Sequence, residues 1–229
     1  MKDLCIGIPH VERGEDYLGQ TLRSLFARDE AMANTVVLIC DFGTAPSRNL
    51  AAVRLAFAGP LADGSLILER FQGPRPPLDG LRRNFGDDPE RVHWRSKQVW
   101  DASWLMARCQ GLARYYLHLE DDVVVAPGYR GEFRDLAPVG DAWGSVKLCR
   151  QGACAVLFHD EDLGKVSAYL QAVYDEMPLD WLLDHFSALK QRTGYPTLLH
   201  PGYFTHIGTH STLRGQLRLT VDEKRRQAS

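Results

Sequence analysis

A buried strand of this chain ends on three consecutive acidic residues. Residues 115–119 (Tyr-Tyr-Leu-His-Leu) form the expected strand, Glu120, Asp121 and Asp122 follow it, and a second apolar run begins at Val123. Open α/β sheets bind their ligands at the carboxyl ends of their strands, so this feature favours such a sheet with a site at that edge. Carboxylate oxygens suit Mg²⁺ or Mn²⁺, and these ions commonly bridge a diphosphate. The alternative is a solvated acidic turn between two strands.

Strands and helices alternate along the first half of the chain. Short apolar runs predict strands, and apolar residues at three- and four-residue spacing predict helices. The strands are expected at 4–9, 35–40, 66–68 and 115–119, and the helices at 17–27, 50–58 and 97–113. This order predicts a parallel, Rossmann-like half in which helices flank the sheet. Residues 71–89 are rich in proline, glycine and arginine, and are expected to form a loop.

The second half of the chain shows a mixture of elements. Paired strands are expected at 142–148 and 153–158, helices at 163–174 and 180–193, and irregular strand character over 198–207. The charged residues 222–229 are expected to form a frayed tail.

The bulk composition excludes several classes of function. The 229 residues are 45% hydrophobic and 24% charged, which is typical of one globular domain. A net charge of −2 provides no basic field for nucleic acid. There is no apolar run of about 18 residues, so no transmembrane segment is expected, and no signal-peptide pattern is found. The five cysteines form no CxxC pair, which favours free thiols, a reducing compartment and a cytoplasmic location.

Five segments, taken together, resemble one enzyme family. They are residues 6–9, 95–98 with Asp101, 119–123 with 127–129, 178–185 and 204–213. In this order they are similar to the catalytic domain of the N-acetylglucosaminyltransferase IV family, over about residues 5–215. Members of that family add a β-1,4-linked N-acetylglucosamine to the α-1,3-mannose arm of N-glycans. The membrane anchor, stem and lectin-like domain of the animal members do not appear in this sequence, which leaves the acceptor open.

The resemblance implies a fold, a reaction and a donor. The implied fold is α/β of the GT-A glycosyltransferase type, a Rossmann-like mixed sheet flanked by helices in a single domain over residues 1–229. Residues 1 to about 125 would form the donor half, and about 126–215 the acceptor half. The implied reaction is a metal-dependent, inverting transfer of N-acetylglucosamine from UDP-N-acetylglucosamine, with Mn²⁺ or Mg²⁺, to a hydroxyl of a glycan or small glycoconjugate. Two alternatives stay open: a transferase for another UDP-sugar, and a catalytically silent module that binds nucleotides or glycans.

The acidic triplet is the expected metal and diphosphate site. Asp122 is expected to bind the ion directly with Glu120 nearby, because alternation along a strand points these two side chains to one side and Asp121 to the other. The resemblance implies a second metal ligand from His206, in the segment His-Ile-Gly. His210, four residues later, is the alternative ligand.

An inverting transfer also needs a carboxylate that takes the proton of the acceptor hydroxyl. The resemblance favours Asp180 as this catalytic base. Asp180 also follows Met-Pro-Leu at the expected helix start, where it would serve as an N-cap, and Asp184 one turn later is the competing base. The neighbouring Trp181 is expected either in the core or as a sugar-stacking platform, and the core is the usual place for a tryptophan in an apolar stripe.

Three basic residues are candidates for binding the diphosphate. Arg95 and Lys97 lie at the start of the expected helix, where the helix dipole disfavours positive charge unless it has another role. Arginine also matches phosphate oxygens in a bidentate manner. Arg13, in the loop after the first strand, is a further phosphate candidate.

The ends of the first two strands are the expected nucleoside site. The resemblance places the uracil ring at Ile8 and Pro9, which end the first strand. Asp41 ends the second strand, where an acidic residue can accept hydrogen bonds from the base or the ribose hydroxyls. An aspartate at that point can equally begin a turn.

Overall fold

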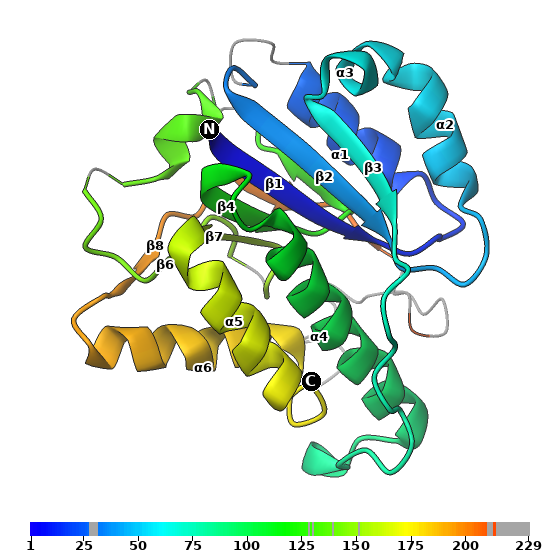
Figure 1. The fold of residues 1–229 in the computed structure, drawn as a ribbon, viewed down its shortest axis with the longest axis vertical. Helices are drawn as coiled ribbons and strands as arrows, with labels where there is room; N and C mark the ends of the chain where they lie inside the picture. The colour runs from blue at the N-terminus through cyan, green and yellow to red at the C-terminus, as the bar shows by residue number, and fades with distance from the viewer. Residues whose placement is uncertain are drawn as a thin grey trace, which may run out of the picture.

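A seven-stranded mixed sheet forms the centre of the molecule (Figure 1). The computed structural model describes residues 1–27, 32–127, 129, 131–138, 140–150, 152–209 and 213. The strands, in the order β3-β2-β1-β4-β7-β6-β8, are β3 (Leu66–Arg70), β2 (Thr35–Asp41), β1 (Lys2–His10), β4 (Ala113–Leu119), β7 (Ala155–His159), β6 (Ser145–Lys147) and β8 (Thr197–Leu199). The first four are parallel, β7 is antiparallel to both β4 and β6, and β8 is parallel to β6.

Helices cover both faces of this sheet. They are α1 (Tyr17–Phe26), α2 (Arg48–Ala56), α3 (Ala58–Asp63), α4 (Pro89–Cys109), α5 (Asp160–Ala172) and α6 (Leu179–Arg192), with short 3₁₀ turns η1 (Asn84–Gly86) and η2 (Phe133–Leu136). Figure 1 shows α4 and α5 crossing one face and α1 behind the parallel strands. Leu4, Ile6 and Ile8 of β1 pack into the core beneath α1, while Cys5 packs on the α4 side. Burial on both faces explains why these strands are continuously apolar.

A second, two-stranded sheet brings distant parts of the chain together. β5 (Val123–Val125) pairs antiparallel with β9 (Phe204–His206), so that Val123 lies opposite His206. The backbone N–H of Ile207 donates to the carbonyl oxygen of Asp122 at 2.9 Å, which extends this pairing by one step. The end of β9 is thereby fixed beside the acidic turn that follows β4.

The structure confirms the predicted alternation of elements but moves one important boundary. Helix α4 begins at Pro89, eight residues before the predicted start at residue 97. Asp88 caps it by accepting a hydrogen bond from the N–H of Arg91 at 3.0 Å, and proline is favourable in the first turn. The predicted loop over 71–89 is therefore shorter, and residues 95 and 97 lie within a helix. The segment 198–207 divides between β8 and β9, which belong to different sheets.

All five cysteine side chains are buried. Within the described ranges, we find no helix that combines the length and the apolar character needed to cross a bilayer. Residues 222–229 lie outside the described part of the chain, as does His210.

Candidate active site

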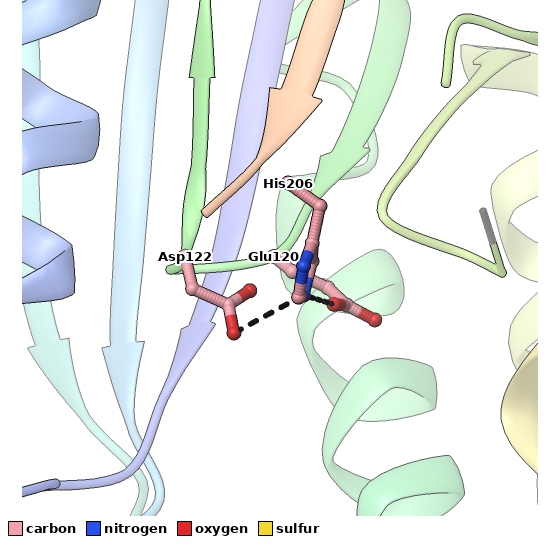
Figure 2. A group of neighbouring side chains, drawn as sticks. All are labelled: Glu120, Asp122 and His206. Atoms are coloured by element: carbon pink, nitrogen blue, oxygen red, sulfur yellow. Dashed lines mark ion pairs between the residues drawn. The ribbon is translucent and has the colours of Figure 1, made fainter. Parts of the chain in front are cut away.

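Glu120, Asp122 and His206 converge at the carboxyl end of β4 (Figure 2). Each offers one ligand atom, and these atoms all lie within 4.8 Å of one another. His206 Nε2 is 3.3 Å from Asp122 Oδ2 and 3.8 Å from Glu120 Oε2. The two carboxylates come from the turn after β4, and the imidazole comes from the end of β9. Carboxylate oxygens with an imidazole nitrogen suit Mn²⁺ better than Mg²⁺, so this donor set fits a divalent ion.

The glycine after Ile207 allows this convergence. A Cβ atom at Gly208 would lie 2.0 Å from Asp122 Oδ2, a distance that no side chain could accept without displacement. Only a residue without a Cβ lets the backbone after β9 approach the carboxylate so closely. The His-Ile-Gly segment thus supplies one candidate metal ligand, and its glycine leaves room for the carboxylate of another.

The third acidic residue of the triplet belongs to a different set of contacts. Asp121 Oδ2 lies 2.7 Å from His10 Nδ1, and Asp121 also pairs with Arg13. The Arg13 guanidinium donates to Asp122 Oδ2 at 2.8 Å as well, so it joins the two aspartates. Residues 120–122 lie in a turn rather than a strand, and strict alternation does not hold there: all three acidic residues line the same cavity.

Asp122 is held in its charged form. Burial opposes ionisation of this carboxyl, but the hydrogen bond with His206 and the charge of Arg13 outweigh that cost and hold its pKa well below the usual range. A carboxylate that stays ionised over the whole physiological range is suited to binding a cation.

A cavity opens beside the three clustered side chains. Its lining comes from the end of β1, the middle of α4, the end of β4, the acidic turn and the start of α6. The predicted residues that line it are Pro9, Arg13, Lys97, Glu120, Asp121 and Asp122. From the sequence, Pro9 was assigned to the nucleoside, Arg13 and Lys97 to the diphosphate, and the acidic triplet to the metal and diphosphate, and the fold brings these six residues to one place.

Three predicted nucleotide contacts lie elsewhere. Ile8 is fully buried in the core because side chains alternate along β1, and its neighbour Pro9 takes the cavity side. Asp41 is buried, and its Oδ1 accepts the N–H of Gly43 at 2.9 Å, so it begins a turn. Neither Ile8 nor Asp41 lines the cavity.

Arg95 is the third residue that the structure removes from the cavity. Its guanidinium is buried and faces the loop before α4, with Nε 3.2 Å from Asp87 Oδ2 and Nη2 donating to the carbonyl of Arg82 at 3.2 Å. Two residues along an α-helix correspond to a rotation of about 200°, so Lys97 faces the cavity while Arg95 faces away. The early start of α4 is the physical reason for this correction.

The cavity also contains residues that sequence reasoning did not assign. Asp101 lies one turn after Lys97 and pairs with it, and burial raises the pKa of Asp101 to about 6. His118, in β4, is fully buried with its Nδ1 3.3 Å from the Tyr116 hydroxyl, and its Nε2 has no hydrogen-bond partner in the described residues. Trp94 and Gln98 complete the α4 side of the lining. The four-residue spacing of Lys97 and Asp101 was the sequence signal for this pair. The same spacing is common for ion pairs on the exposed face of a helix, so it did not indicate a site.

Acidification is expected to destabilise the protein through His118. Burial lowers the pKa of this imidazole from its ordinary 6.5 to about 4. Between those pH values the unfolded chain binds a proton that the folded chain does not, so the free energy of unfolding falls as the pH falls below 6.5. The loss attributable to His118 is about 2 kcal/mol by about pH 5.

Thermal unfolding of the wild type and of His118→Phe, at about pH 7.5 and about pH 5, measures this contribution. The wild type should lose more stability on acidification than the variant, because the comparison cancels the titration of other groups such as Asp101. Equal losses in the two proteins would contradict the assignment.

The predicted base and its competitor occupy different environments on α6. Helix α6 begins at Leu179, which lines the cavity, and Pro178 is its N-cap, so Asp180 does not cap the helix. Asp180 is partly exposed, its side chain lies near Gly152, and it makes no hydrogen bond or ion pair within the described residues. Asp184 pairs with Lys147 instead. Trp181 is 49% exposed, so the expectation of a core position was wrong.

Comparison with known proteins identifies the family. The family model described as the MGAT4 conserved region matches residues 1–225. Zebrafish (Danio rerio) alpha-1,3-mannosyl-glycoprotein 4-beta-N-acetylglucosaminyltransferase C is 33% identical over 97% of this chain and 51% of its own length. The chicken (Gallus gallus) alpha-1,6-mannosyl-glycoprotein 4-beta-N-acetylglucosaminyltransferase is likewise 33% identical, over 97% of this chain and 50% of its own length.

This chain belongs to the N-acetylglucosaminyltransferase IV family. The human (Homo sapiens) alpha-1,3-mannosyl-glycoprotein 4-beta-N-acetylglucosaminyltransferase B is 30% identical over 96% of this chain and 44% of its own length. The chain thus spans about half the length of these relatives.

Solved structures show the fold of this family member to be of the GT-A type. The mannosyltransferase PcManGT of Pyrobaculum calidifontis, in complex with GDP-Man and Mn²⁺, superimposes with a TM-score of 0.55 at 12% identity, over 87% of this chain and 55% of that one. The galactosyltransferase LgtC, in complex with donor and acceptor sugar analogues, gives 0.52 at 16% identity, over 97% and 99%. At these identities the likeness concerns the fold alone.

Proposed function

We propose that this chain is a metal-dependent, inverting glycosyltransferase that moves N-acetylglucosamine from UDP-N-acetylglucosamine to a hydroxyl of a glycan. The observation that carries the proposal is the convergence of Glu120, Asp122 and His206 at a strand end, beside a cavity lined by Lys97. Membership of a family of N-acetylglucosaminyltransferases supports the sugar, and the printed names of the relatives support a mannose-containing acceptor.

The three clustered side chains would hold Mn²⁺ or Mg²⁺. A divalent ion there would neutralise the negative charge that grows on the departing diphosphate. Arg13 and Lys97 add positive charge on the cavity wall, and both are already oriented by carboxylates: Arg13 by Asp121 and Asp122, Lys97 by Asp101. Oriented cations lose little side-chain freedom when an anion binds, which favours binding of the diphosphate.

Asp180 would act as the base. It would take the proton of the acceptor hydroxyl as that oxygen forms its bond to the anomeric carbon and the bond from this carbon to the diphosphate oxygen breaks. Attack from the face opposite the leaving group inverts the anomeric configuration. The absence of a paired cation in the described residues keeps the Asp180 carboxylate available, whereas Asp184 is neutralised by Lys147.

The names of the relatives indicate the class of acceptor. Two relatives of equal identity to this chain carry different acceptor arms in their names, alpha-1,3-mannosyl in one and alpha-1,6-mannosyl in the other. We therefore propose a mannose-containing glycan or small glycoconjugate as acceptor and leave the arm open.

Release of UDP from a panel of UDP-sugars tests the proposal. With Mn²⁺, slow hydrolysis of UDP-N-acetylglucosamine is expected, because water replaces the acceptor, and EDTA should stop it. Preferential release from UDP-galactose or UDP-glucose would support the alternative donor. If no donor releases UDP, calorimetry with UDP decides: binding would favour a silent module, and no binding would rule out the glycosyltransferase proposal.

A further inference from the structure

Two exposed aromatic rings from distant parts of the chain face each other. Phe85 of η1 is 59% exposed and Trp181 of α6 is 49% exposed. Their ring centroids are 5.1 Å apart, and the planes meet at 81° in an edge-to-face arrangement. Single exposed apolar side chains are common on protein surfaces and need no explanation. Exposed apolar side chains that contact one another more often mark a binding site.

The backbone conformation of Phe85 also supports a role in ligand binding. Its φ is 66°, in the left-handed region that a bulky side chain rarely adopts. Such a conformation persists only where the surroundings impose it, and it is common at ligand sites. The ring is not held there by burial, because more than half of it is exposed.

Buried Arg95 and the α5–α6 connection hold this loop in place. Arg95 binds the carbonyl of Arg82 and lies against Asp87, on either side of Phe85 in the sequence. Asn84 Nδ2 donates to both the carbonyl and the carboxylate of Glu176, at 2.9 Å each. The loop is therefore tied to α4 on one side and to the segment leading into α6 on the other, which fixes Phe85 against Trp181. The buried arginine that does not reach the cavity has this role instead.

The pair lies next to the proposed catalytic base. Trp181 directly follows Asp180, and Leu179, one residue earlier, lines the cavity. By helical geometry Trp181 points about 100° from Asp180 and about 200° from Leu179, so the pair lies outside the cavity, and a sugar ring on it would occupy a neighbouring acceptor subsite.

We propose that Trp181 and Phe85 form a platform that binds a sugar ring of the acceptor glycan; this inference rests on the proposed function. Pyranose rings carry a face of C–H groups that packs on aromatic rings, and their hydroxyls at the ring edge remain free to form hydrogen bonds. The surface that two side chains offer is far smaller than the roughly 800 Å² that each partner buries in a protein–protein interface. A single sugar ring matches their size.

The variants Trp181→Ala and Phe85→Gly test the platform. Glycine removes the second ring and adopts the left-handed backbone without strain, so the loop keeps its path. Leu55→Ala on α2 is the matched control, because Leu55 is 84% exposed and distant in sequence from both rings. Each protein is measured for binding to an array of immobilised N-glycans with terminal mannose or N-acetylglucosamine, and for UDP release from UDP-N-acetylglucosamine without acceptor.

The expected result is a loss of glycan affinity of about tenfold or more in Trp181→Ala and a smaller loss in Phe85→Gly. UDP release without acceptor and the binding of Leu55→Ala should match the wild type. Unchanged glycan affinity in Trp181→Ala, or a wild type that binds no arrayed glycan, would overturn the platform while UDP release still tests the proposed function. Trp181-dependent glycan binding in a protein that releases no UDP would support the platform and count against the transferase.

Discussion

Asp122→Asn is expected to abolish metal-dependent release of UDP, with a loss of about a thousandfold or more. Asp122 is buried, it contacts both His206 and Arg13, and its charge is maintained by them. The amide keeps the size of the side chain but removes the negative charge that binds the ion. Several kcal/mol of transition-state stabilisation depend on that ion, and each 1.4 kcal/mol or so corresponds to a factor of ten.

The measurement is UDP release over a Mn²⁺ titration, with binding of Mn²⁺ followed by electron paramagnetic resonance. Asp141→Asn is the matched control, since Asp141 is a surface carboxylate that pairs with Arg114. Gly208→Ala should give an intermediate loss, because its Cβ would displace Asp122 without removing the charge. A folded Asp122→Asn protein with wild-type Mn²⁺ affinity would disprove the metal site.

Asp180→Asn should reduce the rate of transfer to an acceptor by about a hundredfold to ten-thousandfold, while the affinity for UDP stays unchanged. The asparagine side chain cannot take the proton of the acceptor hydroxyl, but the residues that line the cavity are left intact. Asp180 is partly exposed and makes no ion pair in the described residues, so the substitution should not cost stability.

Asp184→Asn is the control for this prediction. It lies one turn along the same helix and is paired with Lys147, so its removal should reduce transfer by only a few fold. Transfer rates to a mannose-containing oligosaccharide, together with calorimetric binding of UDP, separate the two variants. If Asp184→Asn showed the larger loss, the roles of the two aspartates would have to be exchanged.

Local pattern was sufficient to predict most of the fold. Runs of apolar residues such as 35–40 and 115–119 identify strands buried on both faces, and their alternation with helices indicates a parallel sheet with its ligands at the strand ends. The acidic triplet marks that edge directly. The same reasoning misplaced the start of α4, because the capping signal of Asp88 and Pro89 lies inside a segment rich in loop-forming residues.

The direction in which a side chain points can be predicted only when the boundaries of its helix or strand are known. Once α4 starts at Pro89, helical geometry separates Lys97 from Arg95, and only one of them reaches the cavity. Alternation along β1 similarly assigns Pro9 to the cavity and Ile8 to the core. A shift of one residue reverses such assignments, so a small error in a boundary changes the predicted site.

The order of the main strands and helices along the chain, the acidic turn and the family could be read from the amino-acid sequence, because hydrophobic periodicity and short motifs are local properties. The contacts across the molecule were decided only by the tertiary structure. Pairing of β5 with β9 brings His206 to Asp122 across more than eighty residues, a contact that the family resemblance implies but no local pattern shows, and the loop held by Arg95 brings Phe85 to Trp181. Such contacts depend on long-range packing and on a backbone path that no local pattern specifies.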